Sequence, residues 1–433
     1  MTKIQLMNHQ IDVLNATEGM NRVAYYLDMG LGKTYVGSEK AVSLHKNILV
    51  ICQKSKIDDW MNHFVEYYGD LYYLNTIANL TNEKALDAYI HRCENERGLC
   101  IGIINYELAW RRKKLSDLTD FTLMLDESSL IQNENAKRSK FILKDLKPSN
   151  VILLSGTPTS GRYERLWSQL HLLGWDITKT MYWNHYVTVR YQEIYGQRFP
   201  IKIVTGYKNV DRLKTKLREH GCQFLKTEEV MNLPLQNFQE IKIQTTKEYS
   251  VFKKDRIVRV DDKELVGDTV LTRMLYERML CGQYNEYKLE ALKDLLESTE
   301  DRVIIFYSFN EELDKITSIV KDLDRPVSIV NGQTKDLKAY ETHQNSVTLV
   351  QYQAGAMGLN LQKANKIVYF TPPLSSELYE QSKKRIHRIG QERPCFYYNL
   401  ICKNSIEPRI YEVLAMRKDY TDKLFEGDER EQR

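Results

Sequence analysis

Short, continuous apolar runs separated by amphipathic stretches constrain the fold of this chain more than any other feature. Runs of four to six apolar residues bounded by polar sequence are typical of strands that are buried on both faces of a parallel sheet. In the first half they stand at 23–27, 48–52, 99–104, 121–125 and 151–154. In the second half they stand at 303–306, 327–330, 347–350, 366–370 and 396–401. The sequence therefore predicts an α/β fold with two parallel-sheet lobes in tandem.

The two series of runs divide the chain into two expected domains, residues 1–235 and 236–433. The segment between the series, about 175–300, is rich in charge and has weaker strand signals, so we expect mostly helical insertions there. The first domain takes the insertion at about 175–230, and the proline within 232–238 marks the expected crossing point. Near the C-terminus a helical spacing of apolar residues predicts a helix that braces the second lobe: Ile406, Ile410, Val413 and Leu414.

Charge is distributed unevenly along a nearly neutral chain. The 62 basic and 58 acidic residues leave a net charge of +4. Residues 101–250 nevertheless hold 23 basic against 16 acidic side chains, and residues 351–400 hold 7 against 3. Two local basic zones favour a surface for a polyanion such as DNA.

Several features of the sequence indicate the compartment. The chain lacks a run of 18 apolar residues, and its first ten residues lack the apolar core of a secretory signal, so we expect no membrane association. The seven cysteines are an odd number and are scattered without a C-x-x-C pair, which suits neither a disulfide framework nor a zinc site. We expect a reduced, cytoplasmic protein.

A glycine-rich turn follows the first apolar run and precedes a helical pattern. In DMGLGKT (28–34), the backbone N–H groups around Gly30, Leu31 and Gly32 can converge on phosphates at a helix N-terminus. Lys33 would reach the β- and γ-phosphates of ATP, and the hydroxyl of Thr34 would bind Mg²⁺. The full phosphate-loop pattern is not met, because Leu27 occupies the position of its first glycine. The strand before and the helix after favour a nucleotide site over a chance turn.

Two carboxylates end the apolar run 121–125. Because ligands gather at the carboxyl ends of parallel strands, Asp126 is a candidate to hold Mg²⁺, directly or through water. Glu127 is a candidate general base for the water that attacks the γ-phosphate. Alone, this pair also fits a solvated strand end. Together with the glycine-rich turn it predicts nucleotide hydrolysis.

The spaced motifs resemble those of superfamily-two helicase motors. DMGLGKT, LDESS (125–129), LSGTP (154–158), AGAMGLNL (354–361) and QSKKRIHRIGQ (381–391) occur in the family's order. The first and the last of these are similar to the Swi/Snf-like branch, in a compact form of the bacterial and phage type. The resemblance spans Gln10 to about Glu407 and implies two RecA-like lobes that use ATP and Mg²⁺.

The resemblance also assigns roles to single residues. It implies that Gln10 reads adenine, that Gly358 contributes to the nucleotide site, and that Ser155 and Thr157 couple hydrolysis to DNA binding. Ser128 and Ser129 replace the family's more usual small residue and histidine, which puts the coupling from this box in doubt. Segments that contact or relay to DNA in the family contain Lys54, Ser55, Asn105, Tyr106 and Asn360.

Two arginines near the C-terminal end are candidate catalytic groups. Arg385 and Arg388 lie three positions apart on a helix predicted over 376–388, so they would share one face. On spacing alone, a solvated or DNA-facing basic helix is an equal alternative. The resemblance implies that both arginines act on the γ-phosphate.

Two further segments have alternative interpretations. Arg111 and Arg112 begin a basic run that is either a solvated loop or a DNA-backbone contact. The aromatic-rich stretch 181–195 either stacks on bases or forms the core of a small protrusion, and the second interpretation is favoured.

Together these features predict an ATP-hydrolysing translocase on double-stranded DNA that remodels DNA or protein–DNA complexes. Any target specificity would come from a protein partner or from the insertions. A strand-separating helicase is the alternative, because the motor core is shared across the superfamily. A third hypothesis is a DNA-binding adaptor without hydrolysis. It is disfavoured by the presence of a complete set of candidate catalytic residues: Lys33, Asp126, Glu127 and Arg388.

Overall fold

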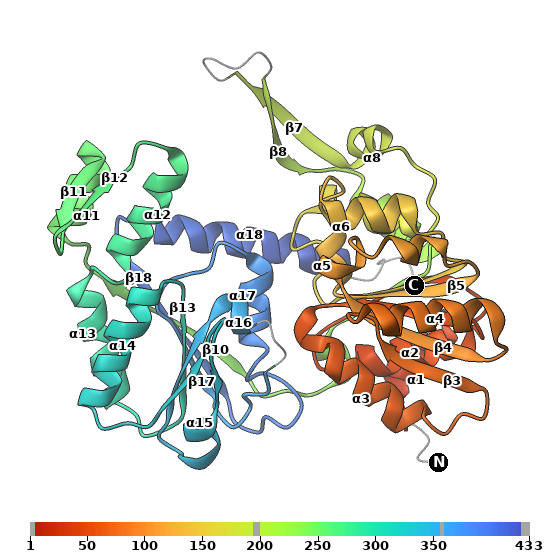
Figure 1. Ribbon diagram of the computed structural model, residues 1–433. Helices are drawn as coiled ribbons and strands as arrows, with labels where there is room; N and C mark the ends of the chain where they lie inside the picture. Colours follow the sequence, from red (N-terminus) through yellow and green to blue (C-terminus); the bar gives the residue numbers. More distant parts are fainter. Residues whose placement is uncertain (1–4, 194–199, 356–358, 426–433) are drawn as a thin grey trace. The chain divides into compact units, whose positions relative to one another are not determined.

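A computed structural model describes residues 5–193, 200–355 and 359–425 of the chain (Figure 1). The backbone forms two compact units, one of residues 1–231 with 419–433 and the other of residues 232–418. Each unit is built around a seven-stranded sheet. The predicted α/β fold with two parallel-sheet lobes in tandem is therefore confirmed.

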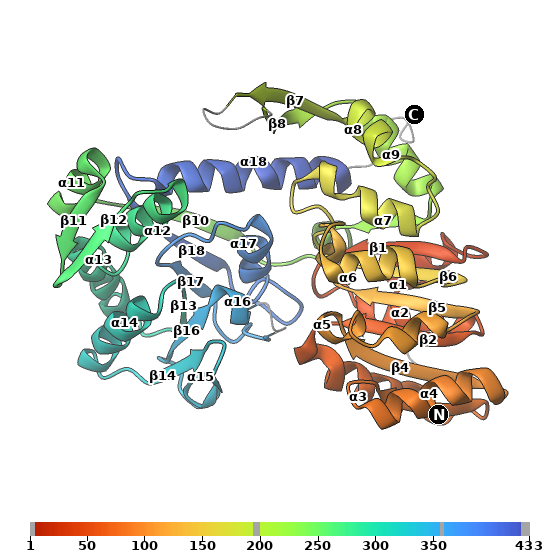
Figure 2. The same ribbon diagram turned by 45° about the horizontal axis from the view of Figure 1, so that its top comes forward.

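The sheet of the first unit is parallel throughout. Its strand order is β3-β4-β2-β5-β6-β1-β9. The strands are β1 (Arg22–Leu27), β2 (Asn47–Cys52), β3 (Leu74–Asn79), β4 (Leu99–Asn105), β5 (Phe121–Asp126), β6 (Asn150–Leu154) and β9 (Cys222–Leu225). Figure 2 shows the helices on the two faces of this sheet.

The central strands of this sheet are buried on both faces. In β1 the side chains of Tyr25 and Tyr26 belong to separate apolar clusters, because successive side chains of a strand point to opposite faces. The longer helices of the unit are α1 (Asn8–Asn15), α2 (Lys33–Ser43), α3 (Ile57–Tyr68), α4 (Glu83–Asn95), α7 (Trp167–Leu172), α8 (Lys179–Tyr186) and α9 (Val210–Glu219). The short ones are α5 (Tyr106–Ala109), α6 (Lys137–Lys140) and α10 (Thr227–Val230).

The second unit has a similar sheet with one antiparallel edge. Its strand order is β10-β18-β17-β13-β16-β14-β15, and only the two-residue β15 pairs antiparallel among these described strands. The strands are β10 (Gln236–Ile243), β13 (Val303–Tyr307), β14 (Val327–Val330), β15 (Lys335–Asp336), β16 (Val347–Gln351), β17 (Lys366–Tyr369) and β18 (Cys395–Cys402). The helices are α11 (Lys247–Asp255), α12 (Val270–Cys281), α13 (Glu286–Glu297), α14 (Asn310–Asp322), α15 (Lys338–Thr342), α16 (Tyr352–Gly355), α17 (Ser376–Lys383) and, up to residue 418, α18 (Glu407–Phe425). None of the helices described is both long and apolar enough to cross a membrane.

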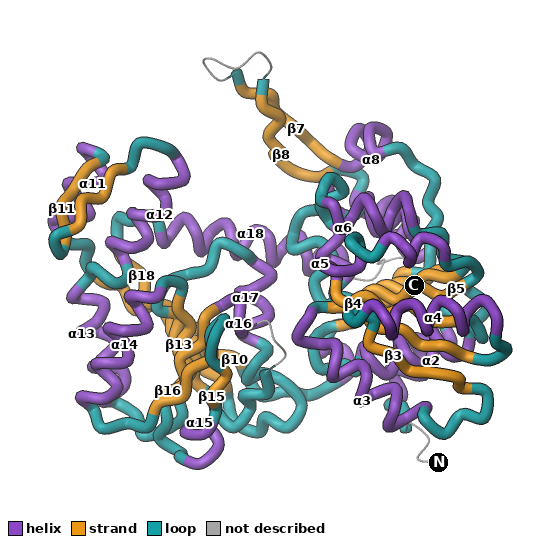
Figure 3. The backbone as a smooth tube through the Cα atoms, in the orientation of Figure 1, coloured by secondary structure: helices purple, strands orange, loops and turns teal. Residues whose placement is uncertain are grey.

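The segment 175–300 differs from the mostly helical insertion that we expected. Beside its helices it contains β9, which is a strand of the first sheet, and β10, which is a strand of the second. It also contains two antiparallel hairpins (Figure 3). One hairpin pairs β7 (Val187–Gln192) with β8 (Ile201–Tyr207). The other pairs β11 (Ile257–Val260) with β12 (Lys263–Val266). These strands are short or half-exposed, so they carry little of the continuous apolar signal that reveals a buried strand.

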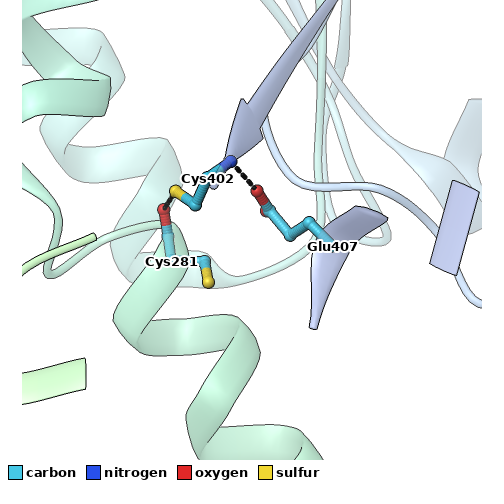
Figure 4. A group of neighbouring side chains, drawn as sticks. All are labelled: Cys281, Cys402 and Glu407. Carbon is cyan, nitrogen blue, oxygen red and sulfur yellow. Dashed lines mark hydrogen bonds between the residues drawn. The ribbon is translucent and has the colours of Figure 1, made fainter. Parts of the chain in front are cut away.

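The C-terminal helix α18 starts at a buried ion pair. Lys288 of α13 and Glu407 are both fully buried, with Nζ and Oε1 2.6 Å apart. Lys288 Nζ also donates to Phe370 O, and Glu407 Oε2 accepts from the backbone N–H of Cys402 (Figure 4). Cys281, Cys402 and Glu407 lie close enough to hold a metal ion, but the ammonium of Lys288 already neutralises this carboxylate. The cluster therefore joins α13, β18 and α18 as a structural element.

Removing one partner of this pair should destabilise the second unit strongly. We expect Lys288→Met to lower the free energy of unfolding by about 3 kcal/mol or more, because it leaves a buried carboxylate without its counter-charge. Adding Glu407→Gln should restore part of the loss. Urea unfolding curves measure both, with Lys46→Met, which breaks the exposed Lys46–Asp120 pair, as the control that costs at most about 1 kcal/mol. A Lys288→Met protein as stable as this control would contradict the assignment.

Candidate nucleotide site and nucleic-acid contacts

The glycine-rich turn connects β1 to α2 at the carboxyl end of the first sheet. Gly30 and Gly32 have φ angles of +91° and +76°, in the left-handed region that a side chain disfavours. Leu31 between them is fully buried and anchors the turn. Lys33 begins α2, and its Nζ donates to Leu27 O at 2.9 Å and to Asp28 O at 3.2 Å. The turn thus holds the lysine amine over its own backbone, with Thr34 as the next residue of the helix.

Gln10 of α1 packs against this turn. Its Nε2 donates to Leu31 O at 3.1 Å, and its Oε1 accepts from Met7 N at 2.9 Å. A Cβ atom placed on Gly32 would lie only 2.1 Å from Gln10 Nε2. A side chain at position 32 would therefore displace the Gln10 amide, in addition to the strain of the left-handed backbone angle.

The two carboxylates lie at the end of β5, with Asp126 as its last residue and Glu127 directly after it. Asp126 is half-buried, and its Oδ2 accepts from Trp60 Nε1 of α3 at 2.9 Å. Burial raises the pKa of the Asp126 carboxyl, while the Trp60 hydrogen bond and the positive charge of Lys33 oppose that rise. Glu127 has a φ angle of +56°, an uncommon value for a residue with a side chain. Such strain is found most often where a side chain must be held in one functional direction.

The segment Ser155–Thr157 lies next to Glu127 of the carboxylate pair and to Lys33 of the glycine-rich turn. Ser155 Oγ donates to Glu127 Oε2 at 3.4 Å and accepts from Thr157 N at 3.1 Å. A Cβ atom on Gly156 would lie 3.4 Å from Lys33 Nζ. Because β5, β6 and β1 are neighbours in the sheet, the residues that follow them meet at one edge.

A buried amide network joins the carboxylate box to the Ser155–Thr157 segment. Gln169 Oε1 accepts from Ser128 Oγ at 2.8 Å, and Gln169 Nε2 donates to Pro158 O at 2.8 Å. Gln132 Nε2 donates to the same carbonyl at 2.9 Å. No motif in the sequence singles out Gln132, Gln169 or Trp60 as site residues. Ser128, whose presence raised doubt about coupling, is itself one end of this connection.

The expected DNA contacts of the first unit divide into exposed and buried residues. Lys54 and Ser55 are exposed after β2. Asn105 and Tyr106 are buried, and Tyr106 OH donates to Asp126 O at 3.0 Å. Of the two expected roles, burial disfavours direct contact of these side chains with DNA, and relay to DNA stays a prediction. Tyr106 instead supports the backbone of the carboxylate pair.

The basic run after α5 is exposed but partly committed to ion pairs. Arg112 pairs with Glu83 and donates to Thr81 O at 2.8 Å. Arg111 is exposed and places its guanidinium 5.2 Å from the centre of the Trp110 ring. Arg111 is thus the more accessible of the two predicted contacts.

In the second unit the predicted helix over 376–388 is wrong in its extent. Helix α17 ends at Lys383; beyond it the backbone N–H of Arg385 donates to Ser382 O, and the carbonyl of Arg385 accepts from Leu361 N. The Arg385 side chain is 1% exposed, whereas Arg388 is half-buried and donates to Asn360 Oδ1. The two arginines therefore do not share a helix face, and Arg388 lies beside another predicted site residue. Gly358 lies outside the described residues.

The residues expected to hold Mg²⁺ fit that ion chemically. The hydroxyl of Thr34 and the carboxylate of Asp126 are the oxygen ligands that Mg²⁺ prefers, next to a lysine suited to phosphate. Thr34 lies in the helix that follows β1, and Asp126 is the last residue of β5, at the same edge of the sheet.

Comparison with known proteins shows the family. The SNF2-related domain family matches residues 9–286, and the helicase conserved C-terminal domain matches residues 287–390. The chain belongs to the SNF2-related family, as its motifs predicted. It is 25% identical to the mouse SWI/SNF-related matrix-associated actin-dependent regulator of chromatin subfamily A member 1, over 89% of this chain and 40% of the relative. It is 22% identical to an uncharacterized ATP-dependent helicase of Mycoplasma pneumoniae, over 93% of this chain and 40% of the relative.

The chain spans about two fifths of the length of these relatives. Among solved structures, the Sulfolobus solfataricus SWI2/SNF2 ATPase core in complex with dsDNA aligns over 97% of this chain and 93% of that one. The TM-score is 0.46 and the sequence identity is 19%.

Replacing Asp126 by its neutral isostere should stabilise the first unit. A carboxyl whose pKa is raised on folding destabilises the folded state once it is ionised. Stability should therefore fall as pH rises from the ordinary pKa of aspartate through the raised one. We expect Asp126→Asn to raise the free energy of unfolding at pH 7 by about 1 kcal/mol, with the gain shrinking at acidic pH. Thermal unfolding between pH 4 and 7 measures this, and a gain that does not change with pH would contradict it.

Proposed function

We propose that this protein is an ATP-hydrolysing motor that translocates on double-stranded DNA and so remodels DNA or protein–DNA complexes. One observation carries the proposal. Lys33, Glu127 and Ser155 follow three neighbouring parallel strands and converge at one sheet edge. This is the arrangement that phosphoryl transfer to water requires, with a phosphate-binding amine, a base and a connection to the rest of the motor.

The residues of this edge would divide the work as follows. The backbone N–H groups of the turn 30–34 and the amine of Lys33 would bind the phosphates, and Gln10 would contact the adenine, as the motif implies. Thr34 and Asp126 hold Mg²⁺, which supplies charge neutralisation on the phosphates when bound. Glu127 takes the proton of the attacking water.

The hydrogen bond of Ser155 to Glu127 links that proton transfer to the segment 155–158. The network through Gln169 extends the link to Ser128. A change in the position or protonation of Glu127 during hydrolysis would therefore alter the hydrogen bonds of the segment 155–158. We propose this as the coupling between hydrolysis and DNA binding.

Duplex contacts are proposed for the exposed Lys54, Ser55 and Arg111, with Asn360 on the second unit. Action of Arg385 and Arg388 on the γ-phosphate stays a prediction from the motif. A protein partner would supply target specificity. A strand-separating helicase is the second candidate, since the β7–β8 hairpin is an element of the kind that splits strands.

ATPase rates without DNA, with single-stranded DNA and with duplex DNA test the proposal. We expect the strongest stimulation by duplex DNA, together with displacement of a triplex-forming strand and no unwinding of a plain duplex. Lys33→Ala is the control and should lower turnover at least about a hundredfold, the scale on which single electrostatic groups act. Absence of stimulation by any nucleic acid would contradict both candidate functions, and unwinding of a plain duplex would favour the helicase.

Glu127→Gln should separate binding from hydrolysis. The amide has the shape of the carboxylate but cannot take a proton, so we expect ATP affinity within a few fold of wild type and almost no turnover. Binding of a fluorescent ATP analogue and steady-state ATPase rates measure the two effects. If affinity falls with turnover, Glu127 is a metal ligand and its assignment as base is wrong.

A further inference from the structure

A small pocket lies where α8 meets the β7–β8 hairpin, away from the nucleotide site. Its volume is about 260 Å³, and its lining is basic, aromatic and polar. The lining residues are Lys179, Thr180, Trp183, Asn184 and Lys202. The pocket is smaller than the pockets that usually enclose a drug-sized ligand, and it suits a group of the size of one base or one phosphate.

Trp183 is the centre of this pocket. Lys202 Nζ lies 4.4 Å from the centre of the indole ring, and Lys179 Nζ lies 5.9 Å from it. The two lysines come from different elements, β8 and α8. The fold therefore places two ammonium groups near one aromatic ring, and the ammonium of Lys179 is also ion-paired with Glu134.

The indole also has an unused hydrogen-bond donor. Trp183 Nε1 is buried and has no hydrogen-bond partner among the residues that the structure describes. Its neighbours in sequence differ from it, since Tyr182 and Tyr186 are buried in the apolar core of the unit. Trp183 packs against the same core but is only half-buried, so the favoured interpretation of this stretch as a protrusion core applies fully to the tyrosines and in part to Trp183.

The hairpin extends the same surface. Tyr191 of β7 pairs directly with Lys202 of β8, so both side chains point to one face of the hairpin. The Tyr191 ring is 63% exposed. Figures 1 and 3 show the hairpin as a ribbon of its own that starts at α8. An aromatic–basic strip, formed by Lys179, Trp183, Lys202 and Tyr191, thus runs from the pocket along the hairpin.

We infer that this strip binds an unpaired segment of a nucleic-acid strand, with a base against Trp183 and the backbone phosphates at Lys179 and Lys202. Sites for single strands combine positive charge that follows the backbone with aromatic rings on which bases stack. In a duplex the bases are already stacked on each other, so a duplex would use the lysines but not the rings. The inference deepens the proposed function and rests on it only for the source of the strand.

An acidic segment of a protein is the competing occupant. It would satisfy the two lysines equally well but has no planar group for Trp183 and Tyr191. The aromatic half of the strip therefore favours a nucleic acid.

Binding of a short fluorescent oligothymidylate to the full-length protein tests the inference, measured by anisotropy at several salt concentrations. We expect Trp183→Ala to weaken binding at least about fivefold, the scale of one stacked base. Lys202→Gln should lower the slope of log affinity against log salt by about 0.7. Lys216→Gln, which changes another lysine of the same unit that is paired with Glu219, is the matched control and should change neither.

Crosslinking provides a second readout that does not depend on a core substitution. An oligonucleotide with 5-iodouracil should crosslink on irradiation to Trp183 or Tyr191, identified by mass spectrometry. Unchanged affinity and slope in Lys202→Gln, with crosslinks only at other positions, would overturn the inference and favour an acidic protein segment. Duplex-stimulated ATPase should persist in Trp183→Ala, so loss of the strip is distinguishable from failure of the proposed motor.

Discussion

Parallel pairing of β5, β6 and β1 is the constraint on which the first unit depends. Parallel strands all end at the same edge, so the residues after these three strands must meet there. The glycine-rich turn, the carboxylate pair and the Ser155–Thr157 segment owe their proximity to this pairing. The register is specific, with Tyr25 opposite Leu154 and Asp126 opposite the same residue on the other side. A slip of one residue would turn every one of these side chains to the wrong face.

The polar groups of the site are held by side chains that do no chemistry themselves. Trp60 donates to the Asp126 carboxylate, Tyr106 donates to the backbone carbonyl of Asp126, and Gln169 joins Ser128 to Pro158. All of these donors are buried or nearly so, which makes their hydrogen bonds costly to break. The left-handed backbone of Glu127 is strained, and the hydrogen bonds of these buried side chains around it stabilise that conformation.

Much of the fold could be predicted because central strands carry a local signal. Buried parallel strands such as β1 and β5 are continuous apolar runs, and the glycine-rich turn follows from the backbone it requires. The edge strands β3 and β10 were not visible, since their half-exposed residues include Asn, Gln and Thr. The end of α17 at Lys383 and the network at Gln169 both depend on the packed fold. Neither leaves a pattern in the neighbouring sequence.

The position of β10 has a consequence for synthesis on the ribosome. Its partner β18 is encoded near the other end of the unit, with Gln236 opposite Cys395. The strand must therefore emerge and wait while almost the whole unit is translated. Many of its side chains are polar or charged, including Gln236, Gln239, Glu240 and Lys242. A polar edge strand of this kind resists pairing with the edge strands of other nascent chains. The polar composition that makes β10 hard to predict from the sequence therefore protects the chain from aggregation during its synthesis.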